Sequence, residues 1–425
     1  MKNNYTNHHM DLGTRIIAQN VVVDNDTRLT GLNNNDMIIA PSGAGKSGSY
    51  VWSNLAMPTG SMVISDTKGL LYKKCAKHLK KHGYAIHKID LVNPESSGGY
   101  NPLQYIRRTK SGRINEKDIK TLANTICPVV STRDPFWEQA AARHITMLLS
   151  YVLEALPPKE QNILSVCDLH RAYVSGEGKS MLADWVEMNP DTLTAKKFKE
   201  MAGFSNVDKT WGCTIEFVNN ALDLFEYAEF APIFKPTKSF DFRQLGHKKT
   251  ALFLITSDND DTYDRIANLI NTQLLQTLID EADQMEEGSL KIPCRIFLDD
   301  FAASSRIPDF ARIISIIRSR SISVSIILQS KSQLDGMYGE HDSASIINNC
   351  DHILIFGPGS DLDTANFVST HLNKTQKSVL TMNNEEAVLI ERGAEARIVK
   401  KIPPYSIPLD DEPDTENKEN AYVNS

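Results

Sequence analysis

The stretch most able to do chemistry is Asp36–Tyr50, DMIIAPSGAGKSGSY, in which an apolar run leads into a glycine-rich turn. The run reads as a short buried strand, and the residues after the turn have helical spacing. Gly43 and Gly45 allow backbone conformations that point N–H groups inward, Lys46 can reach the β- and γ-phosphates, and Ser47 can ligate Mg²⁺. We therefore predict that a nucleoside triphosphate is held by Ser42, Gly43, Ala44, Gly45, Lys46, Ser47 and Gly48.

This stretch departs from the usual phosphate-loop pattern at one position. Ala40 stands where G-x-x-x-x-G-K-S has its first glycine. That position precedes the tightest part of the turn, so alanine is compatible with the loop. A glycine-rich turn with an accidental Lys-Ser is the competing interpretation, and the apolar strand before the turn argues against it.

A second acidic element follows another apolar run, in RIFLDD at Arg295–Asp300. It places two carboxylates at the carboxyl end of a strand, where open α/β sheets hold their ligands. Asp299 is expected to hold Mg²⁺, and Asp300 to orient or deprotonate the attacking water. Most ATPases have Glu at the second position, and Asp is one methylene shorter.

Three further groups belong to the same hypothesis. Gln329 follows the apolar run VSIIL, so it is expected at a strand end beside the γ-phosphate. Arg318 and Arg320 are candidates for an arginine that stabilises transition-state charge across a subunit interface, with a surface ion pair as the alternative for either one. Asp66 and Lys68, in SDTKG, follow another expected strand and are candidates to line the same cleft.

Composition places the chain among soluble globular proteins, with 41% apolar and 23% charged residues in 425. This length can hold two or three domains. The net charge is −7, and much of it lies in an acidic tail after Ser406. Between Lys68 and Lys120 the balance is basic, which suggests either contact with a polyanion or a solvated helix face.

Cysteine and histidine spacing does not indicate a metal site. The six cysteines are far apart without a C-x-x-C pair, which indicates reduced thiols in a cytosolic protein. His78 and His82 have the i, i+4 spacing of metal ligands, but lysines flank them and the nearby sequence supplies no acidic partner, so we interpret them as surface residues. The sequence shows no signal peptide and no apolar run of about 18 residues that could span a membrane.

The order of elements predicts an α/β fold with a mainly parallel sheet and an inserted all-α domain. Strands are expected in RIIAQNVVVD and RLTGL, then in SMVISD, AIHKIDL, TALFLIT, CRIFLDD, SVSIILQS and HILIFG. The predicted boundaries are a first nucleotide-binding part at 1–103, an all-α domain at 104–246, a second nucleotide-binding part at 247–405 and an acidic, disordered tail at 406–425.

Taken together, the motifs resemble the TraG/TraD-type coupling ATPases of type IV secretion and conjugation. The resemblance covers nearly the whole chain, and it rests on the following stretches in this order: TGLNNNDMIIAPSGAGKS, SDTKGLLY, GGYNPLQYI, DPFWEQAA, FLDDFAASSRIPDF, IRSRSISVSIILQSKSQL and NNCDHILIFGPGSDLDTANFVS. It implies a RecA-like P-loop ATPase that uses ATP and Mg²⁺. Lys46 and Ser47 match the family's phosphate and Mg²⁺ positions, Asp299 and Asp300 its acidic pair, Gln329 its sensor and Arg318 its interface arginine.

The resemblance also implies partners. These are single-stranded DNA with a bound relaxase, recognised through the all-α domain, and components of a type IV secretion channel at the inner face of the bacterial membrane. The expected assembly is a homo-hexamer, or a monomer that assembles on DNA. Most relatives carry N-terminal transmembrane helices that this sequence does not show, so either a separate membrane-anchoring subunit or direct docking on the channel is expected.

Two other functions remain open at this point. The first is a coupling ATPase that delivers protein effectors, since its motor core would look the same. The second is a nucleotide-binding adaptor with little turnover, which would dock the relaxase to the channel while another ATPase supplies the work.

Overall fold

The structure is a computed structural model that describes residues 12–129, 134–202, 208–235, 239–257, 261–301, 306–357 and 361–410. The chain forms two compact units. The first takes in the described parts of 1–87, 242–254 and 278–425, and the second those of 88–241 and 255–277. The predicted boundaries at 103, 246 and 405 remain predictions.

A nine-stranded sheet runs in the order β11-β10-β9-β3-β8-β7-β4-β6-β5, and β1 and β2 form a separate antiparallel pair. The strands are β1 (Thr14–Ala18), β2 (Val21–Asp24), β3 (Asp36–Ile39), β4 (Ser61–Thr67), β5 (Ala85–Asp90), β6 (Thr250–Thr256), β7 (Cys294–Leu298), β8 (Ile322–Leu328), β9 (His352–Phe356), β10 (Glu386–Glu391) and β11 (Arg397–Lys400).

The centre of this sheet is parallel and buried on both faces. Strands β9, β3, β8, β7 and β4 pair in parallel, whereas β10 pairs antiparallel with both β9 and β11. Every residue of β3, β7, β8 and β9 is buried. This explains why these strands read as continuous apolar runs instead of alternating patterns. The predicted α/β class with a mainly parallel sheet is confirmed.

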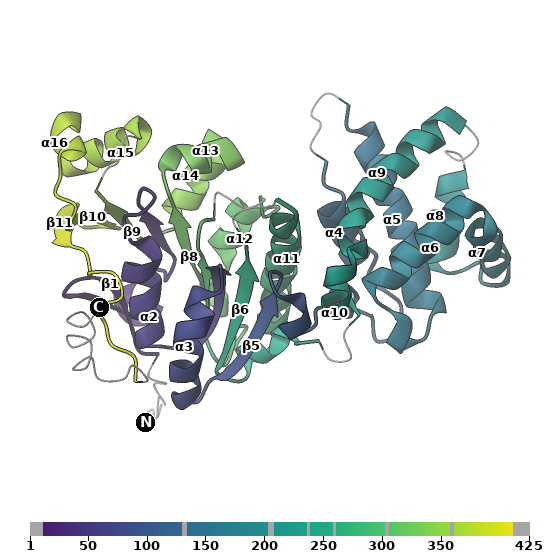
Figure 1. The fold of residues 1–425 in the computed structure, drawn as a ribbon, viewed down its shortest axis with the longest axis horizontal. Coiled ribbons are helices and arrows are strands. Elements are labelled where there is room, and N and C mark those ends of the chain that lie inside the picture. Colours follow the sequence, from purple (N-terminus) through teal and green to yellow (C-terminus); the bar gives the residue numbers. More distant parts are fainter. Residues whose placement is uncertain are drawn as a thin grey trace, which may run out of the picture. The chain divides into compact units, whose positions relative to one another are not determined.

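Short and medium helices complete the first unit, and α13 to α16 gather beyond one end of the strands (Figure 1). They are α1 (Thr27–Thr30), α2 (Trp52–Ala56), α3 (Leu70–Lys81), α12 (Phe310–Ile316), α13 (Lys331–Tyr338), α14 (Glu340–Asn348), α15 (Leu362–Leu372) and α16 (Gln376–Leu380). Helix α11 (Asp261–Gln284) contributes residues to both units.

The strand predicted in RLTGL is wrong, because these residues carry the signals of a one-turn helix. The Asp26 side chain accepts a hydrogen bond from the backbone N–H of Arg28 at the start of α1. Gly31 ends the helix in the left-handed conformation, at φ 71°. A capping residue before the turn and a glycine after it outweigh the β-propensity of the residues between them.

The second unit is mainly helical, as predicted for the segment between the two α/β parts. Its helices are α4 (Glu116–Ile126), α5 (Phe136–Ala155), α6 (Ile163–Ser175), α7 (Glu177–Met188), α8 (Leu193–Ala202), α9 (Asp208–Glu226) and α10 (Ala231–Phe234). Helix α5 is the central one, because it packs against α4, α6, α8 and α9. Among the helices of the described residues, none is both long and apolar enough to cross a membrane.

A fully buried carboxylate fixes the start of β3, the strand that leads into the glycine-rich turn. Asp36 is 1% exposed and accepts hydrogen bonds from Arg15 Nε at 2.9 Å, Arg295 Nη1 at 3.0 Å and the Tyr50 hydroxyl at 2.6 Å. Burial raises the pKa of Asp36, but the two guanidinium groups outweigh it and hold the pKa below its usual range. The cluster joins β1, β3, β7 and the helix after the turn.

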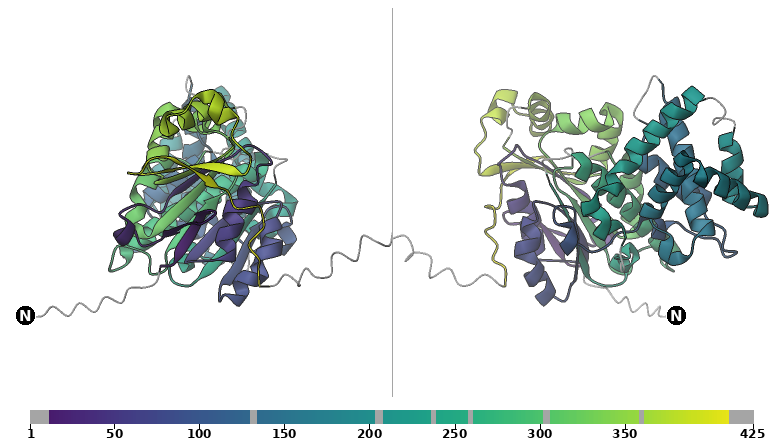
Figure 2. Two further views of the ribbon diagram at one scale, coloured as in Figure 1. Left: turned by 90° about the vertical axis from the view of Figure 1, so that its left-hand side faces the viewer. Right: turned by 45° about the vertical axis from the view of Figure 1, so that its right-hand side comes forward.

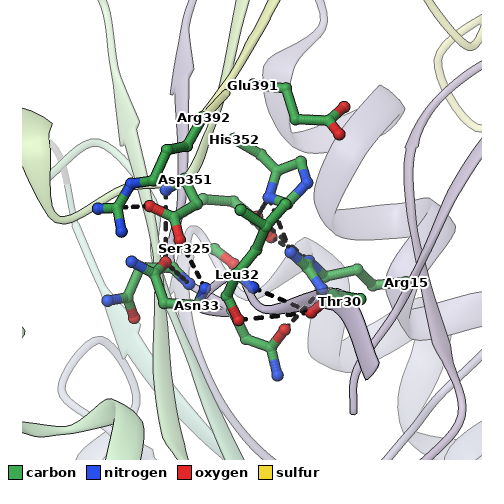
Figure 3. A network of polar contacts seen from close by, with 12 residues as sticks. Arg15, Thr30, Leu32, Asn33, Ser325, Asp351, His352, Glu391 and Arg392 are labelled. Atoms are coloured by element: carbon green, nitrogen blue, oxygen red, sulfur yellow. Dashed lines mark hydrogen bonds and ion pairs between the residues drawn. The ribbon is translucent and has the colours of Figure 1, made fainter. Parts of the chain in front are cut away.

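A second polar network supports the same end of the sheet. The Asn33 N–H donates to Asp351 Oδ2 at 2.6 Å, and Arg392 Nη2 lies 2.7 Å from Asp351 Oδ1. Figure 3 shows these contacts beside Arg15 and His352, whose Nη2 and Nδ1 atoms are 3.0 Å apart. The asparagine run before β3 therefore fastens that strand to β9.

We predict that Asp36→Asn destabilises the chain by about 3–5 kcal/mol, because it leaves two buried guanidinium groups without a counter-charge. Urea denaturation followed by circular dichroism measures this change. The stabilisation is present above the unfolded-state pKa of about 3.9 and is lost as the pH falls through the lower folded-state value.

The control for this variant is Asp168→Asn, since Asp168 is 70% exposed and forms an ion pair with Arg171, three residues further along the chain. It should change the free energy of unfolding by less than about 1 kcal/mol. Equal effects of the two variants would show that the buried cluster does not fix the sheet.

Candidate functional site

Three of the predicted site elements meet at one edge of the sheet. The glycine-rich turn follows β3, Gln329 follows β8, and Asp299 follows β7. These three strands are adjacent and parallel, with Ile39 paired to Leu328 and Leu298 paired to Ile326. Their carboxyl ends therefore meet, as expected for ligand sites in open α/β sheets.

The turn has the backbone of a phosphate-binding loop. Gly43 and Gly45 have φ values of 76° and 83°, in the region that L side chains rarely adopt. The chain then enters a π-helical turn at Ser47–Val51 and continues as α2. The first N–H groups of a helix have no intrahelical acceptor, so this end of the helix offers donors and partial positive charge to an anion.

Lys46 forms an ion pair with one of the two acidic residues after β7. Its Nζ lies 3.1 Å from Asp300 Oδ1, and the side chains are 9% and 35% exposed. Asp300 takes a left-handed conformation, with φ at 49°. The structure thus brings together the phosphate-loop lysine and the acid predicted to act on water.

Ser47 contacts the other acidic residue, because its hydroxyl donates to Asp299 Oδ2. Asp299 Oδ1 accepts the backbone N–H of Asp300 at 3.0 Å. Burial raises the pKa of Asp299 to about 6, and the Asp300 carboxylate adds to the shift against the opposing effects of Ser47 and Lys46. A hydroxyl and a carboxylate oxygen side by side are hard donors of the kind that Mg²⁺ prefers, so the residues present fit that ion.

The arginines do not reach this edge of the sheet. Arg318 and Arg320 form a 3-10 turn before β8, at the opposite end from Gln329, and the seven residues of β8 span about 20 Å. Arg320 is engaged by Asp283, with Nε 2.8 Å from Oδ1. Arg318 is exposed and donates to the backbone carbonyls of Thr27 and Gly31.

Asp66 has a structural role that the sequence did not indicate. Its two carboxylate oxygens accept the backbone N–H groups of Leu71 and Tyr72, at 3.1 and 2.7 Å. These bonds cap the start of α3. Asp66 was predicted to line the nucleotide cleft, whereas in the structure both of its carboxylate oxygens cap α3.

Sequence reasoning missed a C-terminal segment, residues 401–410, that packs against the phosphate loop. It runs beside α2 and α3 as a yellow trace in Figure 2. Lys401 Nζ donates to the Ala44 carbonyl at 3.3 Å. Pro404 lies so close to Gly45 that a Cβ added there would be 2.5 Å from its Cγ. More than 350 residues separate these partners, so no local pattern could reveal the contact.

Tyr405 brings this segment to the acidic side of the site. Its N–H donates to the Gly48 carbonyl at 2.9 Å, and its ring meets Trp52 edge-on with centroids 5.1 Å apart. Burial raises the pKa of Tyr405, and the carboxylates of Asp299 and Asp66 raise it further. The negative charge of Asp299, the candidate Mg²⁺ ligand, therefore acts on the Tyr405 hydroxyl.

The fold and this geometry are those of the RecA-like P-loop ATPase fold class, and comparison with solved structures agrees. Plasmid coupling protein TrwB, in complex with ADP and Mg²⁺, superposes with a TM-score of 0.68 at 14% identity, covering 94% of this chain and 91% of TrwB. VirB4 of Thermoanaerobacter pseudethanolicus gives a TM-score of 0.54, also at 14% identity, over 88% and 91% of the two chains.

The family is shown by the sequence itself. The family model described as type IV secretory system conjugative DNA transfer matches residues 8–388, so the chain belongs to this family of coupling proteins. Protein VirD4 of Agrobacterium fabrum is 24% identical over 341 residues, which are 78% of this chain and 48% of VirD4. Conjugal transfer protein TraG of Escherichia coli is 24% identical over 390 residues, 83% of this chain and 57% of TraG. The chain spans about half the length of these curated relatives.

We predict that Asp299→Asn stabilises the nucleotide-free chain by about 1–2 kcal/mol at pH 8, because it removes the cost of holding a partly buried carboxylate in its charged form. The raised pKa means that this cost develops between about pH 4 and pH 6. The gain should therefore vanish near pH 4, and urea denaturation at several pH values measures it. Destabilisation at pH 8, as expected for Asp36→Asn, would contradict this description of the site.

Proposed function

We propose that the chain is an ATP-driven coupling protein that recruits a relaxase–DNA substrate and moves single-stranded DNA toward a type IV secretion channel. The observation that carries this proposal is the pairing of Lys46 with Asp300 and of Ser47 with Asp299 beyond the carboxyl ends of β3 and β7, in a chain of the conjugative DNA transfer family. The complex of the TrwB neighbour with ADP and Mg²⁺ supports nucleotide as the ligand.

The Lys46–Asp300 ion pair suggests how nucleotide binding prepares hydrolysis. An arriving triphosphate offers Lys46 a denser negative charge than one carboxylate, so the ammonium group moves to the β- and γ-phosphates. Asp300 is then free to accept a hydrogen bond from the attacking water. Ser47 and Asp299 would hold Mg²⁺, which would neutralise charge at the phosphates. Gln329 follows β8, the strand between β3 and β7, and is proposed to sense the γ-phosphate.

Arg318 is proposed to serve the site of a neighbouring subunit. It lies at the end of β8 opposite its own phosphate loop, so it cannot reach its own γ-phosphate. Its partners are neutral carbonyls, whereas Arg320 is committed to Asp283. This favours Arg318 over Arg320 and requires a ring, for which a homo-hexamer, formed in isolation or only on DNA, is the proposed state.

The partners follow from the family and are part of the proposal. The helical unit is proposed to recognise the relaxase complex, and the chain to act in the cytoplasm at the inner face of the membrane through channel components and a separate anchoring subunit. Residues 411–425 of the acidic tail, which lie outside the described residues, are proposed to add partner contacts. Delivery of protein effectors is the second candidate, since the motor core would serve either cargo.

We expect steady-state ATP hydrolysis by the purified chain to rise when single-stranded DNA is added. Lys46→Ala and Asp300→Ala should each lower the rate by at least about 100-fold, because they remove phosphate binding and the group that positions water. Lys374→Ala is the control, since Lys374 is an exposed lysine outside the phosphate loop and the acidic pair. A coupled phosphate-release assay gives the rates.

Two results would contradict parts of this proposal. Tight ATP binding without turnover under any DNA condition would favour the adaptor function. Turnover that ignores DNA but rises with a relaxase or effector protein would favour delivery of protein.

A mixing experiment tests the arginine in trans. We predict that equal amounts of Arg318→Ala and wild-type chains hydrolyse ATP more slowly than the average of the two separate rates, because the sites of the proposed ring act in a coordinated way and one site without its arginine slows the intact sites as well. Arg320→Ala, whose native partner is Asp283 of the same chain, should give simple averages. Additive rates in the Arg318→Ala mixture would contradict an arginine that acts in trans within a coordinated ring.

A further inference from the structure

A cluster of two histidines and one aspartate lies on the first unit, outside the nucleotide site. His78 and His82 come from α3 and its C-terminal cap, and Asp410 comes from the end of the described C-terminal segment. Asp410 Oδ2 is 3.6 Å from His78 Nδ1 and 3.5 Å from His82 Nε2. The i, i+4 spacing of the two histidines is visible in the sequence, but Asp410 lies more than 320 positions away. The interpretation of both histidines as surface residues is wrong for His78, which is 2% exposed.

Backbone carbonyls fix the orientation of both rings. His78 Nε2 lies 3.0 Å from the Ala56 carbonyl, and His82 Nδ1 lies 3.1 Å from the His78 carbonyl. A carbonyl can only accept, so these two nitrogens carry the hydrogens. The other nitrogen of each neutral ring then presents a lone pair toward Asp410. Metal-binding histidines are oriented by this kind of outer contact.

The spacing of the three groups fits a small tetrahedral ion. Zinc binds histidine nitrogen and carboxylate oxygen at about 2.0–2.2 Å, which puts tetrahedral ligand atoms about 3.3–3.5 Å apart. The ligand atoms of the cluster all lie within 4.8 Å of one another. The partial negative charge at the C-terminal end of α3 also favours a cation. Two nitrogens and one oxygen suit Zn²⁺ better than Mg²⁺ or Ca²⁺.

Two contacts compete with such an ion. The Asp410 N–H donates to His78 Nδ1 at 3.1 Å, and Lys81 Nζ donates to the Asp410 carbonyl at 3.2 Å. Binding through His78 Nδ1 must displace the first of these bonds. The second places the Lys81 ammonium group beside Asp410, and this positive charge opposes a cation at the cluster.

We propose that His78, His82 and Asp410 bind Zn²⁺, with a water molecule as fourth ligand, and that the ion fastens segment 401–410 across α2 and α3. The same segment places Pro404 against Gly45 and bonds Tyr405 to Gly48. An ion that fixes segment 401–410 on α3 would therefore also stabilise the contact of this segment with the phosphate loop. Zinc would order this part of the nucleotide site from outside it.

Zinc titration of the full chain by isothermal calorimetry, without nucleotide or DNA, tests the site. Wild type should bind one Zn²⁺ that His82→Asn and Asp410→Asn each weaken by at least about 100-fold. His247→Asn is the matched control, because His247 pairs with Glu281 at 2.8 Å and belongs to no cluster of potential metal ligands among the described residues. His8 and His9 offer another zinc site in the sequence, and its contribution is constant across these variants.

Hydrogen exchange of residues 401–410 gives a second measurement. Zinc at 100 times its Kd should slow exchange there by up to about 100-fold in wild type and in His247→Asn, and leave it unchanged in His82→Asn. Circular dichroism verifies that the variants are folded; His82 is 39% exposed, so its replacement leaves the core intact.

Equal zinc affinity in wild type, His82→Asn and Asp410→Asn would overturn the proposal. Exchange in 401–410 that follows pH but ignores zinc would also overturn it, and would assign the contact to a protonated histidine. Because both measurements omit nucleotide, they are independent of the ATPase proposal, and either can fail without the other.

Discussion

The buried carboxylate of Asp36 is the constraint on which the candidate site depends. It is the first residue of β3, and its two guanidinium partners come from β1 and β7, while Tyr50 comes from the helix that follows the phosphate loop. One charge thus sets the register of the strand before the loop, the helix after it and the strand that ends in the acidic pair. Removing water from these charges is costly, so the arrangement is stable only when all partners are in place.

The parallel register set by Asp36 also positions the residues at the carboxyl ends of the same strands. With β3, β8 and β7 in parallel register, Lys46 meets Asp300 and Ser47 meets Asp299 before any ligand arrives. The two ends of the sheet have opposite energetics. Asp36 is an acid held in its charged form by its neighbours, whereas Asp299 is an acid whose charged form is disfavoured until a cation arrives. The first stabilises the fold, and the second gives up stability for binding.

Local sequence patterns predicted the parts of the site that lie directly at strand ends. The phosphate loop, the acidic pair and Gln329 each follow an apolar run, so their meeting follows from parallel pairing alone. The prediction of a strand in RLTGL was wrong, because capping by Asp26 and Gly31 favours a one-turn helix there. The contacts of segment 401–410 and the cluster with Asp410 could not be predicted, because residues more than 300 positions apart form no local pattern in the sequence. The sequence analysis also did not predict β10 and β11, the two outermost strands on one side of the sheet.

The central claim is that Lys46 and Asp300 form a pair that nucleotide separates. A crystal structure of the chain with Mg²⁺ and a non-hydrolysable ATP analogue tests it most directly. The account predicts that Lys46 Nζ leaves Asp300, from 3.1 Å in the present structure, and contacts phosphate oxygens, with Ser47 and Asp299 at the ion. An analogue bound in the loop while Lys46 remains on Asp300 would contradict the account.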